Sequence, residues 1–263
     1  MAEVITNRKV GTDYYFLELS DDHIDENWQP GRFLHLKVSR DKAYDPLLRR
    51  PFSLFDVNPQ KGTFSLLYCV VGRGTRILTD FGPGEKIDYL GPLGHGFFLP
   101  EGKEIIVIGG GMGTAPLFYL CRKLTLRNRV TLLLGGNICT DVEFFQNKFG
   151  ALDLNIELAT MDGSIGLGGT VIDLWNDLYV DDKHDGDLKK DFDYLYACGP
   201  EPMLAEVQKL AQKYEIEGEI SLEERMGCGI GVCLSCVCDT REGNQRVCKE
   251  GPVFNLDEVI FDE

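Results

Sequence analysis

Residues 104–116 read EIIVIGGGMGTAP, a short apolar run that ends in a glycine-rich turn. The residues that follow, up to 127, have a helical pattern, so the stretch predicts a buried strand, a tight turn and a helix. Such a turn lets backbone N–H groups meet a pyrophosphate at the positive end of a helix dipole. Taken alone, this motif is a weak indication of a nucleotide site.

The same alternation of strand and helix continues to residue 213. The expected strand and helix pairs are 104–108 with 114–127, 130–134 with 141–149, 155–160 with 171–178, and 192–197 with 202–213. Strands separated by helices imply right-handed crossovers and a parallel sheet. Residues 102–217 are therefore expected to form a doubly wound, nucleotide-type α/β domain.

Upstream, residues 1–101 alternate between short apolar segments and turns such as Pro30-Gly31 and Gly91-Pro92. The expected strands include 14–19, 33–38 and 64–70, and only 75–81 has a helical pattern. Many short strands between glycine and proline turns are typical of an antiparallel β-barrel or sandwich. The first domain is therefore expected to be all-β.

The last segment, 218–263, holds five of the nine cysteines. Four follow the spacing C-x4-C-x2-C-x11-C, which is typical of plant-type 2Fe-2S ligands; they are Cys228, Cys233, Cys236 and Cys248. The interspersed glycines Gly227, Gly229 and Gly231 suit a backbone that wraps tightly around an inorganic core. A structural zinc site is the alternative, although zinc ligands usually come as two C-x2-C pairs. Cys238 could replace Cys236, but the x2 interval would then be lost.

The composition excludes several classes of partner. The 263 residues carry 27 basic and 42 acidic side chains, and the net charge of -15 has the wrong sign for nucleic acid or an anionic membrane surface. No segment approaches the roughly 20 apolar residues that cross a bilayer, and the N-terminus has no signal-peptide core. A cytoplasmic location is expected. The odd number of cysteines also argues against a disulfide framework.

Two motifs of the barrel indicate a flavin. Arg49-Arg50-Pro51-Phe52-Ser53 ends a strand, and Val71-Gly72-Arg73-Gly74-Thr75 opens the helix. Together they resemble the ferredoxin-reductase family, whose barrel carries Arg-x-Tyr/Phe-Ser followed by Gly-x-x-Ser/Thr. The alternative is a barrel without flavin.

This resemblance implies a role for each residue of the flavin motifs. Arg50 neutralises the FAD pyrophosphate, next to Pro51, and the Gly74 and Thr75 amides add an anion site. Phe52 packs on the isoalloxazine and Ser53 reaches its N5 edge. The resemblance also places Leu67, Tyr68 and Cys69 along the adenine or ribityl side of FAD.

Three loops of the α/β domain follow strands, at the ends where ligands bind; they are Gly109-Gly110-Gly111 with Thr114, Gly135-Gly136-Asn137, and Cys198-Gly199-Pro200. In the ferredoxin-reductase family the Cys-Gly-Pro loop supports the nicotinamide, which places Cys198 near the carbon that exchanges hydride. A buried strand-end cysteine is the alternative for Cys198. Residues 137–141 have no cation for a 2'-phosphate, and Asp141 would oppose one, so NAD is favoured over NADP.

The order of FAD barrel, nucleotide domain and C-terminal cluster segment resembles the electron-transfer subunits of bacterial class 1B dihydroorotate dehydrogenases. The resemblance is carried by 50–53, 72–75, 91–94, 109–111, 198–200 and 226–233. It implies an FMN-containing catalytic partner in a heterotetramer of two subunits of each kind. Electrons would pass from dihydroorotate through the 2Fe-2S cluster and FAD to NAD, in pyrimidine biosynthesis.

Two alternatives to this function stay open. One is a homologous subunit of a bifurcating ferredoxin-NADP reductase or of a soluble hydrogenase, which would share most of these motifs. The other is a scaffold protein that has lost nucleotide chemistry, for which damaged motifs are expected. The four histidines, His23, His35, His95 and His184, are expected to be structural or surface residues.

Overall fold

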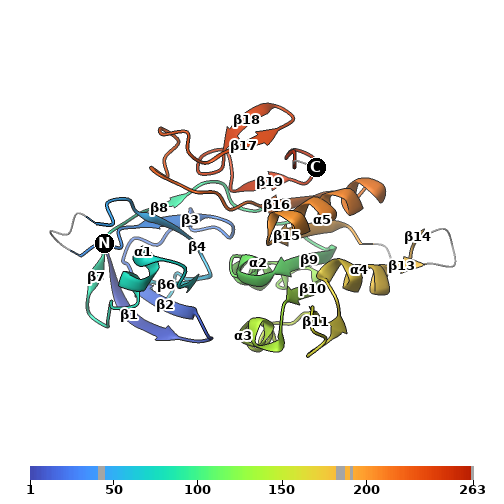
Figure 1. The fold of residues 1–263 in the computed structure, drawn as a ribbon, viewed down its shortest axis with the longest axis horizontal. Helices are drawn as coiled ribbons and strands as arrows, with labels where there is room; N and C mark the ends of the chain where they lie inside the picture. The colour runs from blue at the N-terminus through green and yellow to red at the C-terminus, as the bar shows by residue number, and fades with distance from the viewer. Residues whose placement is uncertain (41–44, 182–186, 190–191, 262–263) are drawn as a thin grey trace. The chain divides into compact units, whose positions relative to one another are not determined.

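A computed structural model describes residues 1–40, 45–181, 187–189 and 192–261 (Figure 1). They form two compact units, the first made of Met1–Phe97 with Glu223–Val253 and the second of Phe98–Leu222 with Phe254–Glu263. The cysteine-rich segment therefore packs with the barrel in one unit. The division into three domains at 101 and 217 stays a prediction, because shared packing does not decide whether a segment folds separately. His184 lies outside the described residues.

The first unit contains the expected antiparallel barrel. One sheet has the strand order β5-β6-β2-β1-β7 and a second has the order β4-β3-β8. The elements are β1 (Ala2–Lys9), β2 (Tyr14–Ser20), β3 (Phe33–Leu36), β4 (Arg50–Ser53), β5 (Asp56–Asn58), β6 (Thr63–Cys69), α1 (Arg73–Leu78), β7 (Lys86–Ile87), β8 (Tyr89–Leu93), β17 (Val237–Thr240) and β18 (Gly243–Arg246). Leu17 and Leu19 alternate into the core from β2, while Trp28 and Phe64 pack ring against ring at 4.9 Å.

The β3–β4 register decides how the flavin motif is presented. Leu36 lies opposite Arg50, His35 opposite Pro51, Leu34 opposite Phe52 and Phe33 opposite Ser53. Directly opposed residues of an antiparallel pair share a face of the sheet, and neighbours along a strand alternate. Arg50 and Phe52 therefore share one face, and Pro51 and Ser53 share the other face with His35.

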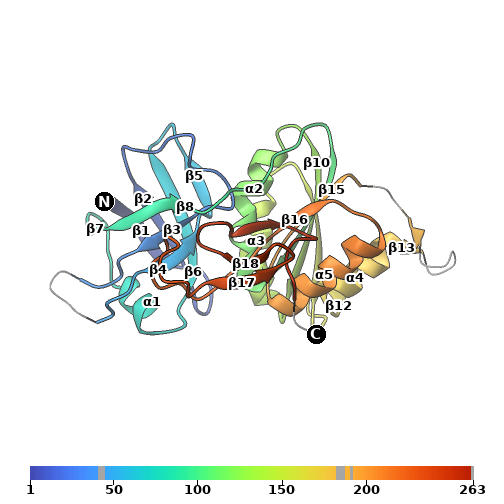
Figure 2. The ribbon, with the colours of Figure 1, turned by 90° about the horizontal axis from the view of Figure 1, so that it is seen from above.

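The second unit is the expected doubly wound domain. Its sheet has the order β12-β11-β10-β9-β15-β16-β19, and β9, β10, β11, β12, β15 and β16 pair in parallel. Helices α2 and α3 cover one face of this sheet, and α4 and α5 cover the other (Figure 2). The elements are β9 (Glu104–Gly110), η1 (Gly111–Thr114), α2 (Leu117–Leu124), β10 (Arg129–Gly136), α3 (Cys139–Phe149), β11 (Asn155–Thr160), β12 (Leu167–Gly168), α4 (Val171–Tyr179), β13 (Val180–Asp181), β14 (Asp187–Leu188), β15 (Tyr194–Cys198), α5 (Glu201–Lys213), β16 (Gly218–Ser221) and β19 (Val253–Asn255).

The sheet order creates a switch point between β9 and β15. From β9 the chain proceeds through β10 and β11 on one side, and then returns to β15 and β16 on the other side. Doubly wound sheets bind ligands at such a reversal, beyond the carboxyl ends of the strands. The glycine-rich turn that follows β9 and the Cys-Gly-Pro loop that follows β15 both lie there. None of the described helices is long and apolar enough to cross a membrane.

Helix α4 shows why this sequence forms a helix where it does. Thr170 is the N-cap residue: its Oγ1 accepts a hydrogen bond from the Asp173 N–H at 3.1 Å, and its own N–H donates to Asp173 Oδ2 at 2.7 Å. This reciprocal capping satisfies two backbone donors that the first turn leaves unpaired. The helix then buries Val171, Leu174 and Trp175 against the sheet.

We expect Thr170→Ala to destabilise the second unit by about 1 kcal/mol, because the cap hydroxyl is lost. Trp28 and Trp175 are the two tryptophans of the chain, one in each unit. In a Trp28→Phe background, fluorescence of Trp175 in denaturant would therefore follow the second unit alone. Thr170→Ser keeps the hydroxyl and is the matched control. Equal unfolding midpoints for the alanine and serine variants would contradict the capping role.

Candidate cofactor sites

The cluster loop, residues 227–236 together with Cys248, brings the four predicted ligand thiols together as two pairs. The Cys228 N–H donates to Cys233 Sγ at 3.4 Å, and the Cys233 N–H donates to Cys228 Sγ at 3.4 Å. Burial and then the neighbouring Cys236 thiol raise the pKa of Cys248, which places these two thiols beside each other. Two pairs of thiols fit a 2Fe-2S cluster, in which each iron takes two ligands. A four-cysteine zinc site would instead gather all four around one point.

Backbone N–H groups surround these sulfurs. Cys228 Sγ accepts hydrogen bonds from Ile230 and Val232 at 3.5 and 3.3 Å, in addition to the bond from Cys233. Gly231 donates to Cys248 Sγ at 3.1 Å. The turn that makes this possible has φ of +71° at Gly229 and +80° at Gly231, which favours glycine. The expected use of glycine for a tight wrap is confirmed at these two positions.

The hydrogen bonds favour thiolates on the exposed side of the loop. The Ser235 hydroxyl, 3.2 Å from Cys233 Sγ, and the neighbouring N–H groups lower the pKa of Cys233 to about 6. The Ile230 N–H is the largest cause that lowers the pKa of Cys228. Burial instead raises the pKa of Cys248 to about 12. A loop that stabilises thiolates suits metal binding, because the thiolate is the ligand form.

An ion pair that no sequence motif indicated holds this loop. Arg246 donates from Nη1 to the Gly231 carbonyl at 2.8 Å and from Nε to Glu250 Oε2 at 2.9 Å. Arg246 lowers the pKa of Glu250 to about 2 through these contacts. The sequence feature that could have indicated this ion pair is the presence of two opposite charges, four residues apart, on either side of Cys248. Together they fix the loop against the segment that carries the last cysteine.

Cys238 lies on β17 opposite Gln245 of β18, in a two-stranded hairpin. Cys236 is 2% exposed and its thiol contacts Cys248. The placement therefore favours Cys236 over Cys238 as the third ligand, although the ligand set itself stays a prediction.

We expect Cys236→Ser to lose the cluster absorbance and iron, because the second thiol pair is broken. Cys238→Ser, two residues away, should keep both and is the matched control. Iron analysis and visible spectroscopy of anaerobically purified protein provide the measurement. Full iron content in Cys236→Ser, or its loss in Cys238→Ser, would reverse the assignment.

The flavin motif brings Arg50 to the start of α1. A Cβ atom at Gly74 would lie 3.1 Å from Arg50 Nε, so the guanidinium stem rests directly on this glycine. Arg50 Nη1 donates to the carbonyls of Leu48 and Arg49 at 2.7 and 3.1 Å. No carboxylate of the described residues pairs with Arg50. A half-buried cation without an acidic partner, beside a helix start, fits a pyrophosphate.

Thr75 shapes the same turn through its hydroxyl. Thr75 Oγ1 accepts hydrogen bonds from the N–H groups of Val71 and Gly72 at 3.0 and 3.2 Å, and donates to the Gly72 carbonyl at 3.1 Å. The hydroxyl is thus occupied in capping its own helix, which is six residues long. Any contact between Thr75 and FAD would therefore involve the backbone N–H of Thr75. This contact stays a prediction.

The remaining predicted flavin residues differ in accessibility. Phe52 is 8% exposed and packs edge-to-face on Tyr68 at 5.8 Å. Tyr68 is 2% exposed, and its hydroxyl donates to Asn7 Oδ1 at 3.0 Å. Leu67 is also buried, whereas Cys69 is partly exposed where β6 ends. Ser53 lies at the end of β4. Contacts of these residues with FAD stay predictions.

We expect Arg50→Ala to weaken FAD binding by roughly 1.5–3 kcal/mol, or about tenfold to a hundredfold in Kd, because a charge-assisted phosphate contact is removed. Arg76→Ala changes an exposed arginine of α1, the helix beside Arg50, and is the control. Flavin occupancy after dialysis, read from absorbance, measures the effect. Equal occupancy in both variants would count against the role of Arg50.

The three nucleotide loops meet at one edge of the sheet, as predicted. Gly109 lies in register with Leu134 of β10 and with Cys198 of β15. A Cβ atom at Gly113 would lie 2.5 Å from Gly199, so the first and last loops are in contact only because both positions are glycine. Because the two loops are this close, backbone amides rather than side chains line the switch point.

Several of the residues predicted to bind NAD are buried or hydrogen-bonded within the protein. Thr114 and Cys198 are each 1% exposed, and the Thr114 hydroxyl lies against Gly109. Asp141 Oδ2 accepts hydrogen bonds from the N–H groups of Asn137 and Ile138 at 3.0 and 3.3 Å. A carboxylate placed on this exposed loop repels a 2'-phosphate, in line with the expected preference for NAD. Contacts of NAD with Gly110, Gly111, Gly199, Pro200 and the other loop residues stay predictions.

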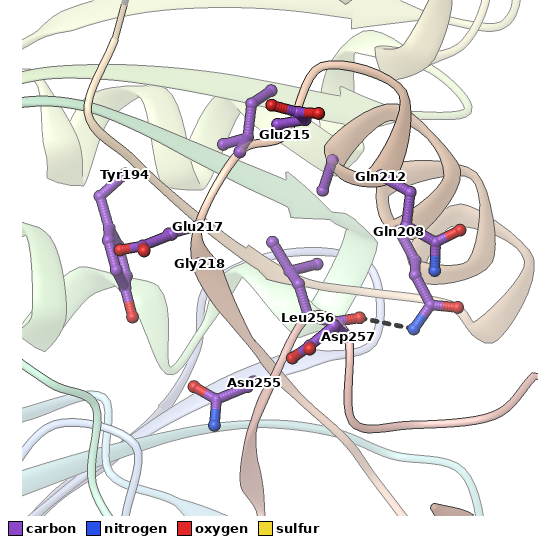
Figure 3. Close-up of a pocket in the computed structure, with 11 residues that line it drawn as sticks. Tyr194, Gln208, Gln212, Glu215, Glu217, Gly218, Asn255, Leu256 and Asp257 are labelled. Atoms are coloured by element: carbon purple, nitrogen blue, oxygen red, sulfur yellow. Dashed lines mark hydrogen bonds between the residues drawn. The ribbon is translucent and has the colours of Figure 1, made fainter. Parts of the chain in front are cut away.

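A separate cavity of about 520 Å³ lies at the other edge of the same sheet (Figure 3). It is lined by Tyr194 and Gly218, which begin β15 and β16, together with acidic side chains such as Glu215 and Glu217. Gln208 Nε2 donates to the Leu256 carbonyl at 2.5 Å across its wall. Nucleotides bind at the carboxyl ends of parallel strands, so this cavity is not the predicted site.

A flavin-type barrel, a doubly wound domain with glycine loops at its switch point, and a loop of paired cysteines define a ferredoxin-reductase-like protein with an iron-sulfur segment. Residues 223–260 match the iron-sulfur cluster binding domain of dihydroorotate dehydrogenase B. The chain is 40% identical to the dihydroorotate dehydrogenase B (NAD(+)), electron transfer subunit, of Shouchella clausii (strain KSM-K16), over 98% of this chain and 96% of that protein. The subunit from Bacillus cereus (strain B4264) is 38% identical, over 98% and 97%. The chain belongs to this family of electron transfer subunits.

Solved structures support the same fold. The NADH-dependent reduced ferredoxin-NADP oxidoreductase, known from work on flavin-based electron bifurcation, superposes with a TM-score of 0.83 at 25% identity, over 99% of this chain and 90% of that chain. A ferredoxin NADP+ reductase from Neisseria gonorrhoeae with bound FAD and NADP gives a TM-score of 0.63 at 16% identity, over 81% and 89%. The second likeness shows the fold alone.

Proposed function

We propose that the chain passes electrons from the FMN-containing catalytic subunit of a dihydroorotate dehydrogenase through a 2Fe-2S cluster and FAD to NAD+, in de novo pyrimidine (UMP) biosynthesis. The observation that carries the proposal is the pairing of Cys228 with Cys233 and of Cys236 with Cys248 in a chain of this family. FAD, when bound, exchanges hydride with NAD and single electrons with the cluster.

The chain's own residues bind and orient these groups. Arg50 supplies the positive charge for the FAD pyrophosphate, and Ser53 is placed at the end of the same strand to reach the flavin edge. The glycine loops present backbone amides to the nucleotide, and Cys198 ends the strand beside them. No side-chain acid or base is required of these residues, because hydride transfer itself needs no separate proton donor or acceptor.

The exposed side of the cluster loop supports a protein partner. Cys233 is exposed, and the neighbouring apolar side chains Ile230, Val232 and Leu234 are 53%, 74% and 62% exposed. An apolar fringe around a redox group is typical of an interaction surface. We infer that the catalytic subunit docks here, in a heterotetramer of two subunits of each kind. A cytoplasmic location is part of the same proposal.

The alternative partner is that of a bifurcating ferredoxin-NADP reductase or a soluble hydrogenase. The bifurcating oxidoreductase shares the fold, but at 25% identity against 38–40% for the dihydroorotate dehydrogenase subunits. Asp141 in the loop after β10 also disfavours an NADP-linked role. These observations favour the dihydroorotate dehydrogenase complex.

The direct test is anaerobic co-purification with the catalytic subunit, followed by FMN, FAD and iron analysis and an assay of NAD+ reduction by dihydroorotate. We expect Val232→Glu to reduce complex yield, because a charge would be buried in the interface. Leu126→Glu, at a site that is 75% exposed in the other unit, should leave the yield unchanged.

Either of two results would overturn this proposal. A complex with full FMN, FAD and iron that does not reduce NAD+ with dihydroorotate would exclude the pathway. Equal complex yield for Val232→Glu and Leu126→Glu would exclude the cluster loop as the docking surface.

A further inference from the structure

His35 is buried beneath the cluster loop although the sequence indicated no particular role for it. It lies on β3, is 1% exposed, and shares a face of the sheet with Pro51 and Ser53 of the flavin motif. Neither ring nitrogen makes a hydrogen bond of good geometry to a described residue. A buried nitrogen without a partner is destabilising, so its position requires a reason.

The imidazole packs directly on the backbone of the cluster loop. A Cβ atom at Gly229 would lie 2.5 Å from His35 Nδ1 and 3.0 Å from Cγ. Gly229 immediately follows Cys228 and has φ of +71°. Two independent constraints, space and backbone conformation, therefore require glycine where the loop meets this ring.

The polar surroundings of the ring come from both cofactor motifs. Burial lowers the pKa of His35, while the backbone of Cys228 on one side and that of Arg49 on the other lie close enough to raise it. Arg49 immediately precedes the flavin strand β4. The imidazole thus lies between the first cluster cysteine and the start of the strand that carries Arg50.

We propose that His35 is a positioning residue for the cluster: its ring, on the strand beside β4, packs against Gly229 and so holds the turn around Cys228. This inference rests on the proposed function, in which Cys228 is a cluster ligand. The turn that His35 supports carries the N–H groups of Ile230, Val232 and Cys233, all of which donate to Cys228 Sγ. Hydrogen bonds to the sulfurs set the reduction potential of an iron-sulfur cluster. His35 therefore acts on the potential through the backbone, without touching iron.

The test compares His35→Ala, which removes the ring, with His35→Phe, which keeps a ring of similar size. The measurements are the cluster midpoint potential by EPR-monitored redox titration, the EPR spectrum, and the iron and FAD contents. We expect His35→Ala to favour the oxidised cluster at least tenfold, a shift of about 59 mV to lower potential for one electron. His35→Phe should restore most of this shift. His23→Phe, at a side chain that is 92% exposed, should change nothing and is the control.

Each other outcome has a defined meaning. Loss of iron with FAD retained in His35→Ala, rescued in His35→Phe, also supports the positioning role. An unchanged potential and spectrum in His35→Ala at full iron content would overturn it. Loss of iron and FAD together in both variants would also overturn it, because His35 would then support the whole unit. Absence of iron from the unmutated protein would instead refute the proposed function.

Discussion

The wrapping of backbone N–H groups around Cys228 is the interaction on which the rest of the first unit depends. Three donors within 3.5 Å of one sulfur require a turn that only small, positive-φ residues can make. The same turn leaves Cys233 exposed and pushes the apolar side chains of Ile230 and Val232 outward. A single local geometry thus both stabilises thiolates and leaves apolar side chains exposed beside Cys233.

Residues of the barrel pack against this turn and support it. Gly229 rests on His35, and the Arg246–Glu250 pair holds the carbonyl of Gly231. The end of the cysteine-rich segment is hydrogen-bonded to the chain that follows β8: the His95 N–H donates to the Gly251 carbonyl at 2.7 Å. These contacts explain why residues 223–253 pack with the barrel that carries the flavin motif, rather than standing apart from it.

In the second unit, the fold brings together backbone amides from loops that are far apart in the sequence. Parallel pairing aligns the ends of β10, β9 and β15, and the strand order reverses between β9 and β15. Glycines at 110, 113 and 199 then let the first and last loops approach to a distance that a Cβ atom would prevent. Asp141, in the first turn of α3, adds a negative charge beside the loop that follows β10.

The sequence by itself determined the features that depend on local pattern. Cysteine spacing predicted the cluster loop, the alternation after residue 102 predicted the parallel sheet, and glycine turns predicted where its loops gather, because ligand spacing and hydrophobic periodicity are set by neighbours along the chain. Only the tertiary structure decided what lies around these motifs. It placed His35 under Gly229, almost two hundred residues away along the chain, and paired the Tyr68 hydroxyl with the Asn7 side chain. Such contacts join segments far apart in sequence, and burial and register, which no local pattern encodes, select them.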